Sequence, residues 1–287
     1  MNRPRLLLFA LAITLLSGCT MAPKYTRPEA PVPAEWPDSL AYEDSMAKPD
    51  ARTVAETGWR EFFADLRLRR IIETALSNNL DLRAAALNVE RARAIYGIRR
   101  VDLLPTVNGA GSYYKAKIPV DISGSEDTPT IEQFEVNLGM ASWEIDFFGR
   151  IRSLKDKALE EYFASEEARR SAQILLVSEV AGVYLVLASD RERLKLAQST
   201  LDTQEAAYNL IRRRREVGLA GELDLRQAQT RVDAARVDIA RYSRQVAQDE
   251  NALNLLTGLP VSNELLPNDL SSVEPPREIS PGLSSEV

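Results

Sequence analysis

The feature that most constrains this chain is the stretch from residue 150 to residue 257, which contains no proline and is bounded by glycine on both sides. Within it, two glycines fall close together in VGLAG (217–221), a sequence typical of a turn. The stretch therefore predicts two helices, 150–216 and 222–257, about 100 Å and 54 Å long at ~1.5 Å per residue. Because a small domain is only about 30 Å across, we expect an extended antiparallel helical hairpin and not a compact enzyme fold.

Both predicted helices carry a row of apolar residues at alternating three- and four-residue spacing, which is the pattern of coiled-coil packing. In the long helix the row is Leu176, Val180, Val183, Leu187, Leu194, Ala197, Leu201, Tyr208 and Ile211, with Asp190 and Gln204 as exceptions. In the return helix the row is Leu225, Ala228, Val232, Ala235, Ile239, Tyr242, Val246, Leu253 and Leu256, broken at Asp249. We call these two rows the seam and expect the helices to pack along it.

The N-terminus indicates export. Two arginines precede an apolar segment at 6–16 that is too short to span a bilayer, so residues 1–18 are predicted to be a signal peptide. The segment ends in LSGC, which resembles the lipobox of bacterial lipoproteins and predicts lipidation of Cys19, the only cysteine in the chain. Several acyl chains together anchor a protein firmly to a membrane. Thr20 follows the cysteine where aspartate would favour the inner membrane, so we expect anchoring at the outer membrane.

Composition excludes several classes of function. The formal net charge is −6 and the pI is about 5.1, which makes nucleic acid a poor partner. The chain has no histidine, so the usual general base and the commonest metal ligand are missing. With a single cysteine, neither a Ser-His-Asp nor a Cys-His arrangement can be built. We therefore expect no catalytic site, no cofactor and no metal; a carboxylate-based hydrolase stays open chemically, but no cleft-forming pattern supports one.

Before the long helices, the chain divides into a tether and a helical segment. Residues 19–57 are rich in proline, which favours extended backbone, and we interpret them as a lipidated tether. Residues 58–105 open with aromatic residues and predict helices at 65–77 and 80–103, the first with Asp65 as its N-cap. The second has apolar or small residues expected to pack: Leu80, Ala84, Leu87, Ala94 and Ile98. After the hairpin, residues 258–287 read as coil.

Residues 106–146 predict a β-hairpin. The second strand, 132–146, alternates apolar Phe134, Val136 and Leu138 with polar or small residues, whereas the first strand, 106–118, alternates less cleanly. Each is long enough to cross a bilayer at a tilt. The alternation alone favours a soluble hairpin with one face on a core. The lipobox and the long helices reverse this preference, and we predict two strands of a transmembrane β-barrel with tyrosine and tryptophan in the interfacial belts.

A length argument links these parts. The return helix covers only about half of the long helix, and the predicted helix at 80–103, about 36 Å long, can fill the rest. The two shorter helices then stack end to end along the long one. A lone pair of strands has unpaired edges, which lipid does not tolerate. We therefore expect the unit to close with further copies of itself into an oligomeric barrel continued by a helical tube.

Several blocks of the sequence resemble one known family. They are LSGC (16–19), YTRPEAPVP (25–33), GWREFF (58–63), NNLDLRAAALNVERARA (78–94), DLLPTV (102–107), WEIDFFGR (143–150) and VGLAGELDLRQAQT (217–230). In order and spacing they resemble the N-terminal half of TolC-type outer-membrane efflux lipoproteins, the exit ducts of tripartite RND pumps. The resemblance implies a trimeric duct that is mainly α-helical, with each helical hairpin serving as one stave of an α-barrel below a β-barrel in the outer membrane. It also implies docking to a periplasmic adaptor of an inner-membrane pump, and a passive conduit in place of an enzyme.

The resemblance also places the docking tip. Val217, Gly218, Leu219, Asp224 and Leu225 correspond to the turn that meets the adaptor. The residues support a turn independently, since Gly218 suits a left-handed position after a helix. Gly221 suits an N-cap, with Asp224 three residues on, where a carboxylate stabilises free amides and the positive helix end. A purely structural role for Asp224 therefore stays open, and the arginines at 212–215 are explained by the helix dipole or by docking.

One departure from the family bears on function. The family carries this unit twice in tandem, whereas this sequence contains it once, so we expect a truncated chain that supplies half of the strands and staves. Two other hypotheses stay open: a periplasmic adaptor, and a coiled-coil lipoprotein with no transport role. An adaptor is expected to have β-structure on both sides of its helical hairpin, and a spacer is expected to lack strands that face lipid.

Overall fold

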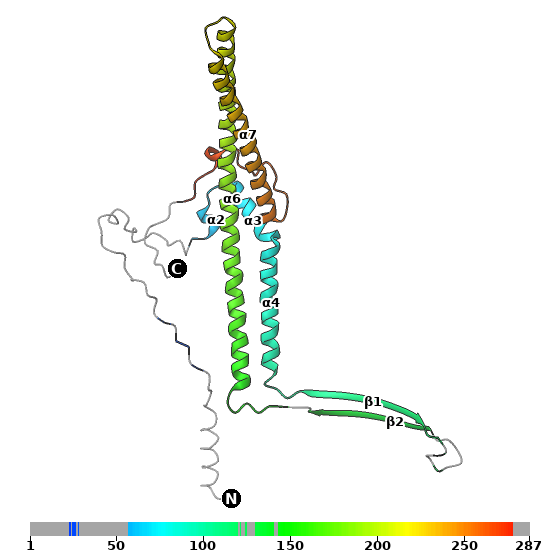
Figure 1. Ribbon diagram of the computed structural model, residues 1–287. Helices are drawn as coiled ribbons and strands as arrows, with labels where there is room; N and C mark the ends of the chain where they lie inside the picture. The colour runs from blue at the N-terminus through cyan, green and yellow to red at the C-terminus, as the bar shows by residue number, and fades with distance from the viewer. Residues whose placement is uncertain are drawn as a thin grey trace. The chain divides into compact units, whose positions relative to one another are not determined.

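The computed structural model describes residues 23, 25, 26, 28, 57–119, 121, 124, 130–140 and 143–277. The described chain consists of helices, one two-stranded antiparallel sheet and a short 3₁₀ helix (Figure 1). It forms two compact units. Of the described residues, the first contains those within 88–166, and the second contains 57–87 and 167–277. The predicted signal peptide and the lipidation site at Cys19 lie outside the described residues.

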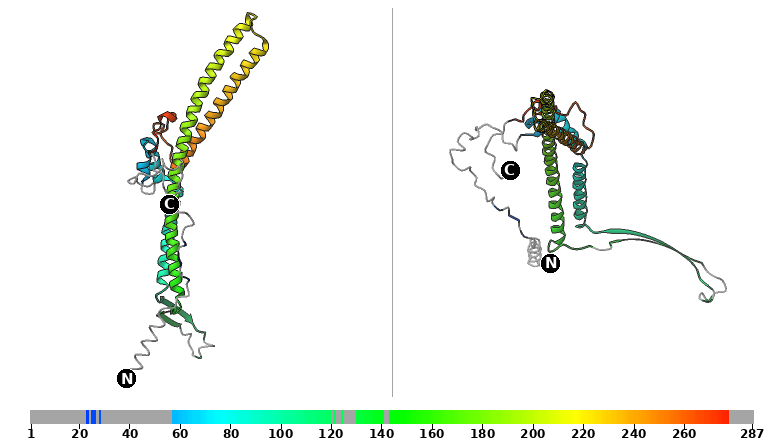
Figure 2. Two further views of the ribbon diagram at one scale, coloured as in Figure 1. Left: turned by 90° about the vertical axis from the view of Figure 1, so that its left-hand side faces the viewer. Right: turned by 45° about the horizontal axis from the view of Figure 1, so that its top comes forward.

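The long helical hairpin has the predicted bounds. Helix α6 runs without interruption over Arg150–Glu216, and α7 covers Glu222–Thr257. In the second unit the two helices lie side by side as far as the connecting turn (Figure 2). Every residue of the predicted seam is buried or partly buried, including the polar exceptions. The three-four spacing therefore identified the packed face of both helices correctly, because residues three and four apart share one side of a helix.

The core of the second unit lies where α7 and α6 meet a short helix, α3 (Leu66–Asn78). Leu68, Ile71 and Ile72 of α3 pack against Tyr184 of α6 and Leu253 of α7. Trp59 of the single-turn helix α2 (Trp59–Phe62) and Phe63 after it cover the cluster. Apolar residues from three helices thus form one hydrophobic core. The burial of their side chains is the main stabilising contribution in this unit.

Asp65 fixes the start of α3, as predicted. Its Oδ1 accepts hydrogen bonds from the amides of Arg67 and Leu68, 2.8 and 3.2 Å away. The hydroxyl of Tyr184 donates to the other carboxylate oxygen at 3.3 Å, which ties the N-terminus of α3 to α6. Burial raises the pKa of Tyr184, and the nearby Asp65 carboxylate raises it further. The hydroxyl therefore remains a hydrogen-bond donor throughout the physiological pH range.

The predicted end-to-end junction of the shorter helices is present. Helix α4 covers Leu80–Val101, and its cap residue Asn79 donates a side-chain hydrogen bond to the carbonyl of Leu256 near the end of α7, at 2.9 Å. Gly258 ends α7 in the left-handed region, with φ +70°. A Cβ at this position would lie 2.8 Å from the carbonyl oxygen of Asn78, so only glycine allows the two helix ends to approach this closely.

The segment after α7 is more ordered than coil. Residues 258–277 pack onto the second unit, with Leu266 and Pro267 buried. Arg191 of α6 donates 2.7 Å hydrogen bonds both to the carbonyl of Pro267 and to the carboxylate of Glu250 on α7. A 3₁₀ turn, η3 (Leu270–Ser272), follows and is capped by Asp269. The predicted coil is confirmed for the described residues apart from η3, but the sequence analysis did not predict that the segment is packed, because only a few apolar residues anchor it.

The predicted packing face of α4 was wrong. Leu80, Leu87 and Ile98 are exposed, and no residue of α4 is fully buried. The partly buried residues of this helix are instead Leu82, Ala85, Ala86, Val89, Ala92 and Tyr96. These also follow three-four spacing, because α4 is apolar on two faces and the pattern alone could not choose between them. In the first unit, residues 88–101 lie beside residues 150–166 of α6 (Figure 1).

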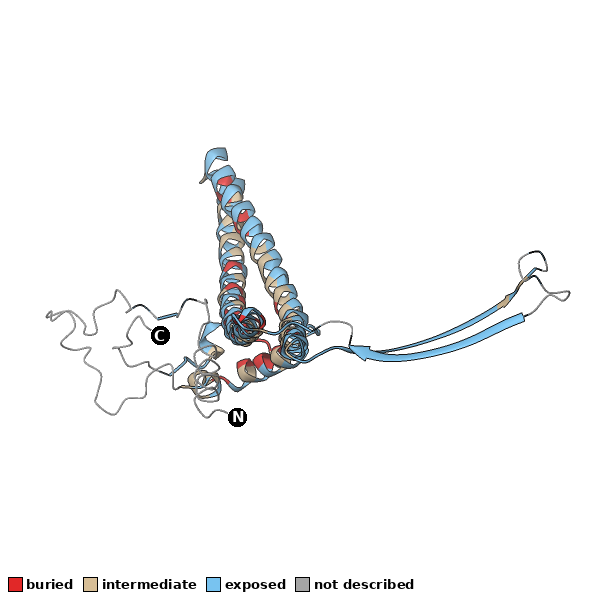
Figure 3. Ribbon diagram, turned by 90° about the horizontal axis from the view of Figure 1, so that it is seen from below, coloured by how far each residue is buried: buried red, intermediate tan, exposed pale blue. Residues whose placement is uncertain are grey.

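The β-hairpin is shorter than predicted at one end. Strand β1 covers Val107–Lys117 and pairs with β2, Thr130–Met140, in antiparallel register from Val107 opposite Met140 to Lys117 opposite Thr130. The predicted second strand continued to residue 146. Strand β2 ends at Met140, and residues 143–149 are not strand; within them, Asp146 accepts hydrogen bonds from the amides at the start of α6. Almost every residue of both strands is exposed (Figure 3).

One described helix, α6, contains a stretch long and apolar enough by composition to cross a membrane. Several residues of that stretch are used elsewhere: Leu176, Val180 and Leu187 belong to the core of the second unit. Others, including Ile174 and Val186, are exposed in the single chain. Packing within the described chain thus accounts for only part of the apolar composition of α6.

Candidate functional site

The turn that joins α6 to α7 has a Schellman geometry, and we call this turn together with the first turn of α7 the tip (residues 217–224). Gly218 has φ +79°, a left-handed conformation that favours glycine. The amide of Gly218 donates to the carbonyl of Arg215 at 2.9 Å, and the amide of Leu219 donates to the carbonyl of Arg214 at 2.7 Å. These two bonds satisfy carbonyl groups that the helix end leaves free. The conformation predicted for Gly218 is therefore confirmed.

Asp224 holds the other side of the tip. Its Oδ2 accepts a hydrogen bond from the amide of Gly221 at 3.0 Å, while Gly221 occupies the N-cap position of α7. This is one half of a capping box, since glycine has no side chain to complete the other half. Both ends of the tip are fixed by hydrogen bonds, so its residues are presented in one conformation.

The tip exposes apolar side chains. Val217, Leu219 and Leu223 are each 69% exposed, whereas Leu225 is buried in the seam. The structure thus brings Val217, Gly218 and Leu219 together at the surface but places Leu225 between the helices. Sequence reasoning missed Leu223. The sequence did contain a clue to it: Leu223 is apolar and lies in the first turn of α7, but it does not belong to the seam. Clustered exposed apolar residues of this kind mark interaction surfaces.

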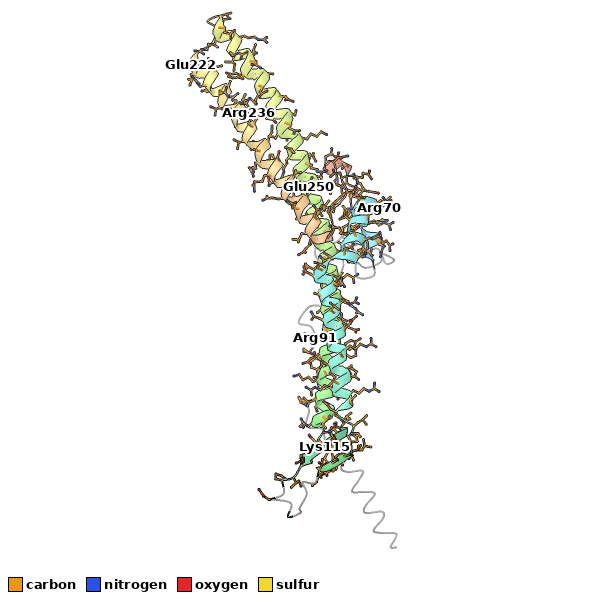
Figure 4. The ribbon with its side chains drawn as sticks, turned by 90° about the vertical axis from the view of Figure 1, so that its right-hand side faces the viewer. Arg70, Arg91, Lys115, Glu222, Arg236 and Glu250 are labelled. Atoms are coloured by element: carbon orange, nitrogen blue, oxygen red, sulfur yellow. The ribbon has the colours of Figure 1, made fainter. Side chains whose placement is uncertain are left out.

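Charged residues surround the tip in interlocking pairs. Glu222 lies close to the turn at the end of the helical hairpin (Figure 4). It forms ion pairs with Arg215 of α6 and with Arg226 one turn further along α7, the latter at 2.8 Å. Arg213 and Arg214 are exposed and form no ion pair within the described part of the chain. They lie in the last turn of α6, where positive charge is favoured by the helix dipole. The exposed apolar residues of the tip are thus flanked on the α6 side by arginine side chains.

The seam contains one electrostatic defect. Asp190 of α6 is buried and accepts a 3.0 Å hydrogen bond from Arg193, whereas Oδ2 of Asp249 on α7 is buried with no hydrogen-bond partner among the described residues. Burial raises the pKa of Asp249, and the charges of Asp190 and Glu250 raise it further. These two carboxylates are two of the three polar residues that interrupt the apolar rows; the third is Gln204.

The β-hairpin is the second candidate surface. Alternation places Val107, Tyr113, Phe134, Val136, Leu138 and Met140 on one side, which we call the apolar face. Tyr113 lies opposite Phe134, with ring centroids 4.7 Å apart, and the next pair on the same face is an ion pair between Lys115 and Glu132. Val136 is 87% exposed. The opposite side carries mostly small and polar residues, together with the exposed side chains of Tyr114 and Ile131. A two-sided strand pair with nothing on its apolar face is unstable in water by itself.

The junction between β2 and α6 is held by paired charges. Asp146 accepts hydrogen bonds from the amides of Ile151 and Arg152, at 3.1 and 3.0 Å, and thereby caps the first turn of α6. Glu144 forms a two-point contact with the guanidinium group of Arg150, one bond of which measures 2.8 Å. The WEIDFFGR block is thus a structural motif that turns the chain from strand into helix.

Within the described residues, no group of three or more histidine, cysteine, aspartate or glutamate side chains is arranged to hold a metal ion. A pocket of about 440 Å³ lies among α3, α4 and α6 in the second unit. Its lining includes Asn78, Arg83, Arg169 and Gln173 but no carboxylate. The lining thus lacks the pair of acids that a histidine-free hydrolase would need.

Comparison with known proteins gives a consistent result. The family model described as outer membrane efflux protein matches residues 71–259. A curated relative, the probable efflux pump outer membrane protein TtgC of Pseudomonas putida, is 43% identical over 98% of this chain. The chain spans 58% of the length of that relative.

Solved structures agree in fold. A membrane protein from Pseudomonas aeruginosa matches with a TM-score of 0.74 and 36% identity, over 93% of this chain and 59% of its own. The open state of the Neisseria gonorrhoeae MtrE outer membrane channel matches with a TM-score of 0.67 and 33% identity, over 91% of this chain and 57% of its own. Both matches include most of the described helices and strands.

Proposed function

The chain belongs to the outer membrane efflux protein family, and from that premise we propose that it forms part of a passive conduit for small molecules across the periplasm and the outer membrane. The observation that carries the proposal is similarity along nearly the whole chain to efflux pump outer membrane proteins. A wall that guides diffusing molecules needs no catalytic residue, no cofactor and no metal. The same similarity favours a conduit over a periplasmic adaptor and over a coiled-coil spacer.

The proposal gives each segment of the chain a location and a role. Residues 1–18 direct export, and residues 19–57 form the tether attached to lipid at Cys19. The segment 106–146 lies in the outer membrane and closes with strands of other copies in a trimer, because lipid does not tolerate open sheet edges. Residues 147–257 form a stave of a periplasmic tunnel, braced by residues 58–105. Residues 258–287 lead on from the end of α7.

The tip is the proposed docking site for the periplasmic adaptor of an inner-membrane RND pump. Val217, Leu219 and Leu223 form an exposed apolar surface whose backbone is fixed by hydrogen bonds. Covering this surface with a partner removes apolar area from water and so favours binding. Gly218 and Asp224 contribute by fixing the conformation of the tip, and Leu225 contributes by packing in the seam beneath it. The negative net charge disfavours nucleic acid as a partner.

Site-specific crosslinking tests the docking proposal. A photoreactive amino acid is placed at Leu219 in one sample and at Val237 in another, since Val237 of α7 is exposed to almost the same degree, at 66%. We expect a crosslink to a purified periplasmic adaptor from position 219 and little from position 237. Equal crosslinking from both positions, or none from 219, would exclude the tip as the docking site.

Detergent dependence tests the membrane placement separately. The substitution Cys19→Ser removes the acylation site while leaving the exposed β-hairpin intact. We expect the unacylated chain to remain insoluble without detergent, because the apolar face still needs lipid. A fully soluble Cys19→Ser chain would support the coiled-coil lipoprotein and contradict the conduit.

A further inference from the structure

The side of the β-hairpin opposite the apolar face, which we call the second face, carries one charged side chain, Glu135 of β2. Alternation along the two strands places this residue on the second face, opposite Ser112. The other residues of the second face are uncharged: Asn108, Ala110, Tyr114, Ala116, Ile131, Gln133, Asn137 and Gly139. The charges of Lys115, Lys117 and Glu132 belong to the apolar face. Within β1 and β2, Glu135 alone therefore gives the second face its negative charge.

The charge of Glu135 is not neutralised by a neighbour. Its Oε1 accepts a 2.8 Å hydrogen bond from Nδ2 of Asn137, two residues further along the same face. That amide is uncharged, and Glu135 forms no ion pair within the described part of the chain, whereas Glu132 on the apolar face pairs with Lys115. Glu135 is exposed. The hydrogen bond thus holds the carboxylate over the second face and leaves its charge available to solutes.

Glu135 lies at the middle of the strand pair. The register runs from Val107 opposite Met140 to Lys117 opposite Thr130, and the pair of Glu135 with Ser112 is the sixth from either end. Five residues of extended chain, or ~17 Å, therefore separate it from each end of the ladder. Because the pairing is continuous over this range, the position of Glu135 does not depend on the segments that flank the strands.

The orientation of the second face in a membrane follows from the apolar face. In a membrane barrel, apolar side chains face the lipid and the alternate side chains face a polar lumen, where substitutions change selectivity. When the hairpin closes with other copies into the proposed barrel, each copy places Glu135 in the lumen at the same height, and the carboxylates form a ring. Rings of aspartate or glutamate favour cations in channels. We propose that Glu135 makes the conduit prefer cationic solutes over anionic ones, an inference that rests on the proposed function.

The remaining charges of the hairpin do not oppose this preference. Residues 107–140 contain two lysines and five acidic residues, a net charge of −3. Both lysines belong to the apolar face, and the segment between the strands contains only acidic charges, those of Asp121, Glu126 and Asp127. In water, an unscreened unit charge ~10 Å away roughly doubles the local concentration of a monovalent cation and roughly halves that of an anion. One carboxylate per copy is thus enough for a measurable preference.

Ion selectivity in planar lipid bilayers tests the proposal. The full chain is purified in detergent and reconstituted, and the ratio of K⁺ to Cl⁻ permeability is obtained from the reversal potential across a gradient of KCl. We expect a clear preference for K⁺ when the dilute side is ~10 mM, where the Debye length is about 30 Å, and almost none near ~1 M, where it is about 3 Å. This salt dependence identifies the preference as electrostatic.

Three substitutions locate the preference on the second face. Glu135→Gln keeps the size of the side chain and removes its charge, so the permeability ratio should fall about two- to fourfold at low salt. Glu135→Lys reverses the charge and should lower the ratio further, while the single-channel conductance shows that each variant still forms a pore. Glu132→Gln is the matched control. It removes the same charge from the apolar face and should leave the ratio close to that of the wild type.

The outcomes separate this inference from the function on which it rests. If the wild type conducts and Glu135→Gln has the same permeability ratio, the selectivity role of Glu135 is excluded while the conduit stands. Equal shifts from Glu135→Gln and Glu132→Gln would assign the preference to the net charge of the hairpin and would also overturn the proposal. If the wild type forms no channel, the conduit fails and the inference fails with it.

Discussion

The core of the second unit and the β-hairpin differ in what stabilises them. In the core, Tyr184, Leu187 and Leu253 are completely buried by other parts of the same chain. In the hairpin, Val136 and Leu138 are more than 80% exposed, although they are equally apolar. The helical core buries its own apolar residues, whereas the hairpin leaves its apolar residues exposed. In the function proposed above, lipid and the strands of other copies would cover them.

The largest expected effect contrasts these two regions directly. Leu253→Ala removes a fully buried side chain and should lower the free energy of unfolding by about 3–4 kcal/mol through lost burial and a cavity. Leu138→Ala makes the same chemical change in the hairpin, where the side chain is 82% exposed. It should change the urea unfolding of the helical core by less than about 0.5 kcal/mol. Equal losses from both variants would break the comparison.

The next effect concerns close approach at helix ends. Gly258→Ala forces an alanine into a left-handed conformation and places its Cβ 2.8 Å from the carbonyl oxygen of Asn78, so we expect a loss of about 3 kcal/mol. Gly218→Ala is the matched control. Gly218 has the same left-handed backbone conformation, but no atom beyond its neighbours in the chain lies within 4 Å of the added Cβ. It should cost only about 1 kcal/mol, and thermal unfolding monitored by circular dichroism at 222 nm measures both.

The difference between these glycines shows what a sequence can specify. The bounds of α6 and α7 were predicted correctly because glycine and proline mark helix ends through local backbone geometry. The left-handed conformation of Gly218 followed from the same reasoning. The close approach at Gly258 did not, because the neighbouring carbonyl comes from a residue far away in sequence.

Tertiary contacts account for the other errors as well. Helix α4 offers two apolar faces, and only the position of α6 determines that Val89 and Tyr96 are covered while Leu87 and Ile98 are exposed. The order of residues 258–277 likewise depends on Arg191 of a distant helix. At the tip, the sequence identified the turn and its cap but not the exposure of Leu223, since exposure depends on the direction in which α7 leaves the turn.

A third prediction concerns the defect in the seam. Asp249→Asn should stabilise the second unit by about 1 kcal/mol at neutral pH, because it removes a charge from a buried oxygen without a hydrogen-bond partner. The pKa of Asp249 is raised in the folded chain by burial and by the carboxylates of Asp190 and Glu250. The arginines on α6 do not offset this, since Arg191 pairs with Glu250 and Arg193 with Asp190.

The raised pKa also fixes the sign of the pH dependence. The folded state binds the proton more tightly than the unfolded state, so wild type loses stability as pH rises through the folded pKa. The advantage of Asp249→Asn should therefore be largest near pH ~7 and disappear below pH ~4, where the carboxyl group is protonated in both states. Urea unfolding of both proteins at the two pH values measures the difference. An advantage that persists unchanged at the lower pH would exclude the charge as its cause.

The smallest effect lies at the tip, which resembles the hairpin in being exposed but the core in being fixed by hydrogen bonds. Asp224→Ala removes the acceptor for the Gly221 amide and a favourable charge at the start of α7, so it should cost about 0.5–1 kcal/mol. Asp224→Asn retains an acceptor and should recover about half of this loss. In the crosslinking experiment, a structural role predicts that the yield from position 219 follows stability, with the asparagine variant close to wild type. If both variants lose the crosslink equally while differing in stability, the carboxylate itself contacts the partner. Asp224 would then belong to the docking surface as well as to the cap.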